Sequence, residues 1–181
     1  PGFVDQRTVD YAKVSGLQST DASGTRTTGA AYVVALPADY STFAPSEIRP
    51  LIGSATGIVL QQQTAANLAA TVGSTLQVLG STRSLKVDGV VDLPNADSFF
   101  QIVGAPPGSA ALAAPDNVLL VPTNVFASLT SGITVVHQLH VRLEHRSLPK
   151  DPGAAANDVT KRANHYVTAV AGSALVGDDL G

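Results

Sequence analysis

The chain has 181 residues, of which 44% are hydrophobic, so it can bury a core and is too apolar to be disordered throughout. Its net charge of -3 and its lack of a Lys/Arg cluster argue against a protein that binds nucleic acid through the phosphates. It has no cysteine, which excludes disulfides, thiolate zinc sites and a cysteine nucleophile.

The start of the chain predicts that it is a segment of a longer protein or follows a processing step. There is no methionine, and the first residues, Pro1-Gly2-Phe3-Val4, do not look like a signal peptide. No run approaches the roughly 18 apolar residues that a membrane-spanning helix needs. We therefore expect a soluble segment that begins inside a longer protein or follows a processing step, and whose parent protein need not be soluble.

The first third of the chain is predicted to be mostly β-strand. Residues 4–18 carry a mixed strand-like alternation, residues 19–29 are rich in Ser, Thr and Gly like a hairpin loop, and residues 30–36 form a second strand that Pro37 ends. We expect residues 4–18 and 26–36 to pair.

Residues 40–53 are predicted to be irregular but packed down. Pro45 and Pro50 forbid a long helix, while several apolar side chains anchor the segment. Arg49 lies among these anchors. Its guanidinium is interpreted as a donor to backbone carbonyls in a turn, in preference to a ligand contact.

The stretch 57–91 is predicted to be a compact unit around which the rest is arranged. It reads as a strand at 58–60, a short helix at 63–70, and a β-hairpin whose strands are 76–78 and 85–91.

Residues 93–116 are predicted to form a long loop rich in Pro and Gly, and loops of this length usually have a role or are mobile. The apolar run 99–103 within it is interpreted as docked on the core or, alternatively, as a contact surface for another protein. If it is such a surface, Phe99, Phe100 and Ile102 are the candidate contacts.

The last third is predicted to alternate strands and helices. An apolar strand at 117–121 precedes a short helix that Thr123 or Asn124 caps and that buries Val125, Phe126 and Leu129. Residues 133–145 form the longest strand. Asp151-Pro152 begins a helix that runs to about Ala171. The predicted apolar stripe of this helix consists of Ala156, Val159, Ala163, Tyr166, Val167 and Val170, and its polar residues, among them Asp158 and Arg162, face away.

Four residues near the end of the long strand could suggest a metal site: His137, His140, Glu144 and His145. On a strand they cannot converge, because residues that share a face, such as His137 and His145, lie about 26 Å apart. Asp88 and Asp92 are likewise about 13 Å apart, too far to share a proton.

No phosphate-binding or nucleophile motif appears. The Gly-rich run 53–57 lacks the lysine of a phosphate loop, and no serine lies in a G-x-S-x-G turn. We predict no catalytic residue, no cofactor and no metal ligand.

The order of these pieces resembles the extracytoplasmic (periplasmic core) domain of MacB/FtsX-like ABC-transporter permeases. The matching positions are the helix step Ala65/Leu68, Val72-Gly73, the strand 87–91 and the strand 119–122 that ends in Pro122. The resemblance covers about residues 30–171. The chain departs from the family at its front, where the usual first helix is not evident, and in the long loop 93–116.

The resemblance implies an α+β fold with two subdomains. A membrane-proximal α/β subdomain would be formed by both chain ends, residues 1–36 and 124–181. A β-rich subdomain would be inserted at 37–123 and would contain the loop.

The resemblance also implies a function without catalysis. The segment would lie on the extracytoplasmic face of the membrane and transmit conformational change between an envelope protein or exported substrate and a cytoplasmic ATP-binding subunit, which it would reach through the parent's membrane part. The parent permease would be dimeric.

Two alternatives stay open at this point. One is a free-standing secreted or cell-surface binding module, and the other is a secreted hydrolase whose site is not recognisable from sequence.

Overall fold

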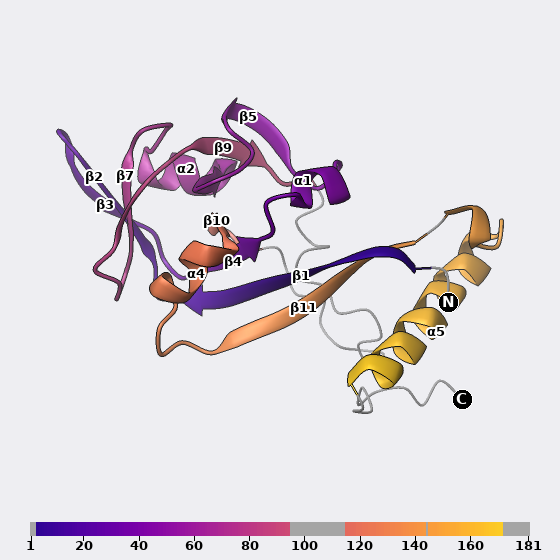
Figure 1. Ribbon diagram of the computed structural model, residues 1–181. Helices are drawn as coiled ribbons and strands as arrows, with labels where there is room; N and C mark the ends of the chain where they lie inside the picture. The colour runs from indigo at the N-terminus through magenta and orange to yellow at the C-terminus, as the bar shows by residue number, and fades with distance from the viewer. Residues whose placement is uncertain (1–2, 95–114, 144, 172–181) are drawn as a thin grey trace. The chain divides into compact units, whose positions relative to one another are not determined.

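The computed structural model describes residues 3–94, 115–143 and 145–171 (Figure 1). The chain is of mixed α+β type, so the predicted fold class is confirmed. It divides into two compact units. The described part of the larger consists of residues 6–94 and 115–140, and that of the smaller consists of residues 3–5, 141–143 and 145–171. The subdomain boundaries that the sequence suggested, at 36/37 and 123/124, stay a prediction.

A seven-stranded mixed sheet contains most of the long strands. Its strands, in spatial order, are β11 (Val135–Leu143), β1 (Phe3–Val14), β4 (Ala31–Leu36), β10 (Val118–Pro122), β6 (Val59–Gln61), β9 (Gly89–Asp92) and β5 (Arg49–Gly53). The β1–β4 pair is antiparallel, as the sequence predicted, and β4 and β10 are parallel. The central strand β10 is buried from Val118 to Val121, which explains why it reads as a continuous apolar run.

A second, four-stranded sheet is antiparallel throughout. Its order is β3 (Gly24–Thr27), β2 (Leu17–Asp21), β7 (Thr75–Val78) and β8 (Ser84–Lys86).

Two predicted strands are wrong in the same way, because each is divided between the two sheets. The predicted strand 4–18 breaks at Gly16, where an added Cβ would lie 2.7 Å from the carbonyl oxygen of Thr28. The predicted strand 85–91 breaks at Val87 and Asp88, so that β8 pairs with β7 while β9 pairs with β6 and β5 of the larger sheet. Alternation along the chain does not reveal which sheet a strand joins, because that depends on pairing with distant residues.

Two short helices complete the core of the larger unit. The helix α2 (Gln62–Leu68) begins where the Gln61 side chain accepts a hydrogen bond from the Thr64 amide at 3.1 Å, and it ends at Ala69, which is left-handed at φ 47°. The helix α4 (Thr123–Leu129) buries Phe126 and Leu129, as predicted.

The predicted details of α4 need two corrections. Pro122 occupies the N-cap position and no side chain caps the helix, so the predicted caps Thr123 and Asn124 are wrong. Val125 is only partly buried against the core.

The segment predicted to be irregular contains two regular elements. The helix α1 (Tyr40–Phe43) buries Tyr40 and Phe43, and β5 forms the outermost strand next to β9. Proline is tolerated on an edge strand, so Pro50 did not prevent β5 from forming. The guanidinium of Arg49 bonds the Asp92 carboxylate at 2.6 Å across this pair, which corrects the prediction that it bonds backbone carbonyls.

In the smaller unit, η1 (His145–Ser147) precedes α5 (Pro152–Ala171). The Asp151 carboxylate accepts a hydrogen bond from the Ala154 amide at 2.8 Å, so the predicted N-cap is confirmed. The predicted stripe is partly wrong, because Ala156 is exposed whereas Asp158 and Arg162 are half-buried and paired at 2.6 Å. Among the described helices, none combines the length and the apolar character that crossing a bilayer requires.

Candidate functional site

The candidate contacts Phe99, Phe100 and Ile102 lie outside the described residues. Glu144 lies outside them too, and His145 begins η1. The predicted strand of the remaining two histidines is confirmed as β11. Within the parts of the chain that the structure describes, no three His, Asp or Glu side chains gather as metal ligands would.

The two histidines of β11 have separate surroundings. His137 is exposed, and its Nδ1 lies 2.8 Å from the Asp10 carboxylate on β1. His140 is half-buried, on the same strand face as Gln138, and contacts α1. Of these two histidines, His140 bonds a residue that lines the cavity described next.

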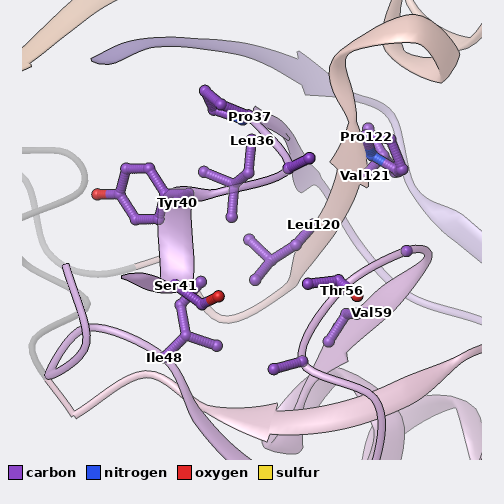
Figure 2. A pocket seen from close by; sticks show the side chains of 13 residues that line it. Leu36, Pro37, Tyr40, Ser41, Ile48, Thr56, Val59, Leu120, Val121 and Pro122 are labelled. Carbon is purple, nitrogen blue, oxygen red and sulfur yellow. The ribbon is translucent and has the colours of Figure 1, made fainter. Parts of the chain in front are cut away.

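A cavity of about 260 Å³ lies in the larger unit, where β4 and β10 end. Figure 2 shows Leu36 and Leu120 between Tyr40 on one side and Thr56 and Val59 on the other. The thirteen lining residues include no charged side chain. The cavity therefore suits an uncharged group.

One wall of this cavity is the loop 54–57, which Asp88 holds in place. The Asp88 carboxylate accepts a hydrogen bond from the Ile58 amide at 2.7 Å. The backbone carbonyl of Asp88 accepts one from the Ser54 amide at 3.0 Å. Gly57 has φ +95°, and a Cβ there would collide with the Asp88 carboxylate. Gly57 and Asp88, candidates in the sequence for a phosphate loop and for a carboxylate pair, thus fix the backbone of this wall.

The opposite wall is α1, which Arg7 of β1 holds at its first turn. The Arg7 guanidinium donates to both oxygens of the Asp39 carboxylate, at 2.6 to 3.1 Å. Its Cζ also lies 5.0 Å from the centre of the Phe43 ring, a cation–π distance. The hydrogen bonds from Arg7 lower the pKa of Asp39 below its usual value.

The same wall is held a second time, by His140. The Tyr40 hydroxyl lies 2.7 Å from Nδ1 of His140, and the Gln138 side-chain oxygen lies 3.1 Å from Nε2. Because an amide oxygen can only accept, the proton of the neutral imidazole is assigned to Nε2, and Nδ1 accepts from Tyr40. The two rings meet edge to face at 5.6 Å.

Burial keeps this pair neutral. It lowers the pKa of His140 to about 4 and raises that of Tyr40 above its usual value. The alternation of β11 placed Gln138 and His140 on one face, but no sequence signal pointed to Tyr40 as their partner.

Comparisons with known proteins show which fold the chain has. No protein-family model matches the chain, and no curated protein matches it. Among solved structures, the periplasmic region of MacB from Actinobacillus actinomycetemcomitans is similar, with a TM-score of 0.58 and 13% identity over 96% of this chain and 71% of that one.

The chain has the fold of the MacB periplasmic region.

A domain of a Porphyromonas gingivalis protein described as a permease is also similar, with a TM-score of 0.51 and 14% identity over 93% of this chain and 70% of that one. The resemblance to MacB-like extracytoplasmic domains is thereby confirmed as a likeness of fold. In this MacB-type fold, the helix α1 and the loop 54–57 form the two walls of the cavity.

Proposed function

We propose that the chain is the extracytoplasmic domain of an ABC-transporter permease, which transmits conformational change and contributes no catalysis of its own. The likeness to the MacB periplasmic region over 96% of the chain is the observation that carries this proposal. A cytoplasmic ATP-binding subunit would act on the domain through the membrane part of a dimeric parent protein.

The polar groups of the larger unit support a structural use. Asp88 bonds the Ile58 amide, Asp92 pairs with Arg49, and His140 bonds Tyr40. These side chains, which a hydrolase could have used as acids or bases, fix loops and strands in the described fold.

The parent gene provides the first test. Apolar spans of about 20 residues should be encoded on either side of this segment, since a span of that length crosses a bilayer. A parent gene that encodes no such span would overturn the proposal and favour a free-standing secreted or cell-surface module.

The location can be tested by labelling in cells, because this chain has no cysteine of its own and any cysteine elsewhere in the parent protein can be replaced first. In the parent protein, Thr25→Cys on the exposed strand β3 should react with a membrane-impermeant maleimide added outside the cytoplasmic membrane. The control Leu119→Cys, which is fully buried and does not line the cavity, should react only after denaturation. Labelling of Thr25→Cys only after lysis would contradict the proposed location.

We also propose that Phe99, Phe100 and Ile102 contact an envelope protein or an exported substrate. The parent protein in which all three are replaced by Ala should lose partner capture or transport. A matched control replaces two exposed apolar residues of β5, Leu51 and Ile52, by Ala. Equal loss in both variants, or no loss when 93–116 is deleted, would contradict this contact.

A further inference from the structure

Two strands of the large sheet pass from one compact unit to the other. The division falls between Asp5 and Gln6 on β1, and between His140 and Val141 on β11. Arg7 lies one residue inside the first crossing, and His140 is the last residue before the second.

Both of these side chains hold the same short helix. Arg7 bonds Asp39 and lies over Phe43, while His140 bonds Tyr40. All of these contacts lie inside the larger unit. Each of the two crossing strands therefore contacts the same five-residue segment, 39–43, through one side chain. We call each of these contacts a grip.

We expect the order of helix α1 to depend on these contacts together with the burial of Tyr40 and Phe43. This helix has four residues, and a helix of one turn is not stable in isolation because nucleation is unfavourable. Its own backbone hydrogen bonds span a single turn: the amides of Thr42 and Phe43 donate to the Asp39 carbonyl and that of Ala44 to the Tyr40 carbonyl, at 2.8 to 3.0 Å. A segment held in this way opens as a unit, so the two grips are expected to depend on each other.

We propose that residues 39–43 are a latch that couples β1 and β11 at the points where they leave the larger unit. When both grips are made, α1 is ordered and Tyr40 and Ser41 form the cavity wall. When either strand moves at its crossing, α1 opens, the other grip weakens and the wall is lost. The latch rests on the proposed function for its purpose, because transmission of movement is what it would serve.

The latch differs from two independent contacts in a measurable way. A hydrogen bond contributes about 1 kcal/mol, which is roughly a fivefold change in a local opening constant. In independent contacts, losing the Tyr40 hydroxyl removes one bond and leaves the Arg7–Asp39 bonds as strong as before. In a latch, the same change also weakens the Arg7–Asp39 bonds, beyond any effect that passes through the pairing of β11 with β1.

Backbone amide hydrogen exchange of the 181-residue chain tests this, with the variants Tyr40→Phe, Asp39→Ala and the double variant. Tyr40→Phe keeps the ring and loses only the hydroxyl. In a latch each single variant should speed exchange in 40–44 by clearly more than the fivefold of one lost bond, approaching about 25-fold when both grips are lost, and Tyr40→Phe should also speed exchange at 6–8 of β1. The double variant should speed exchange by clearly less than the product of the two single effects, because each single change already weakens the other contact.

Two variants of the same chemical kind serve as controls. Arg49→Ala breaks another Arg–Asp pair of 2.6 Å, and His137→Gln removes another histidine of β11 that pairs with a neighbouring strand. Neither should change exchange in 40–44. Unchanged exchange of the buried β10 amides shows that every variant keeps its core.

The proposal is overturned if the two single effects multiply in the double variant, or if Tyr40→Phe leaves residues 6–8 unchanged. The readout needs only this chain, whereas the proposed function is tested in the parent protein. Failure of the exchange experiment therefore contradicts the latch alone, and failure of the tests in the parent protein contradicts the proposed function alone.

Discussion

The Tyr40 hydroxyl donates a hydrogen bond of 2.7 Å to Nδ1 of His140, a residue 100 positions further along the chain. The bond joins a one-turn helix to the edge strand β11. It needs an unprotonated Nδ1, since a protonated imidazole has no acceptor. The state of one imidazole therefore affects how firmly α1 is held.

The folded state should become less stable as the pH falls, because His140 becomes protonated. Its folded pKa of about 4 lies below the ordinary value of 6.5, so the unfolded chain binds the proton more tightly. The contribution is fully present above pH 6.5 and is lost progressively as pH falls towards 4. We expect the loss to reach roughly 2 to 3 kcal/mol in denaturant-unfolding curves. The same curves for His140→Gln should lack this component, and an identical pH slope in both proteins would contradict the assignment.

Gly57→Ala should be strongly destabilising. At φ +95° an alanine is strained, and its Cβ would displace the Asp88 carboxylate that bonds the Ile58 amide. We expect a loss of about 2 kcal/mol or more in the free energy of unfolding. Gly73→Ala is the matched control, with φ +84° and open space around the added carbon, so its loss should be only about 1 kcal/mol. Equal losses would show that Asp88 does not matter here.

Ala69→Gly should stabilise the chain. Ala69 is exposed and left-handed at the end of α2, where glycine is favoured. We expect a gain of about 0.5 to 1 kcal/mol, seen as a higher melting temperature. Ala66→Gly, at an exposed position inside the same helix, should lower the melting temperature instead, because glycine is unfavourable there.

Thr64→Val should weaken the contact between α2 and β10. The Thr64 hydroxyl is buried and accepts a hydrogen bond of 2.8 Å from the Val118 amide. Valine keeps the shape but leaves this donor without its partner, at a loss of about 1 to 3 kcal/mol in unfolding free energy. Thr160→Val, whose hydroxyl is exposed on α5, should change it by less than about 0.5 kcal/mol. A neutral Thr64→Val would mean that the amide finds another acceptor.

The sequence predicted the elements whose local pattern decides their structure. The alternation of β11 and the apolar run of β10 were sufficient, and Asp151-Pro152 marked the start of α5 by cap chemistry alone. The strand prediction for β11 also separated His137 from His140, as the structure shows.

The sequence could not predict what depends on distant pairing. The helix α1 is held by Arg7 and His140, neither of which is close to it in sequence. The bond between Arg49 and Asp92 follows from the register of β5 against β9. The breaks at Gly16 and Asp88 follow from the division of neighbouring strands between two sheets. The candidate site around Tyr40 was missed for the same reason.

The outermost strand β5 has a consequence for the behaviour of the protein in concentrated solution. It exposes 42% of Leu51 and 56% of Ile52, but it also contains Pro50 and an irregular register between Pro50 and Ile52. Proline cannot donate to a neighbouring strand, and a bulge twists an edge away from pairing. This border of the sheet is thus ill-suited to recruiting a strand from another molecule, so its apolar side chains can stay in water without seeding fibres.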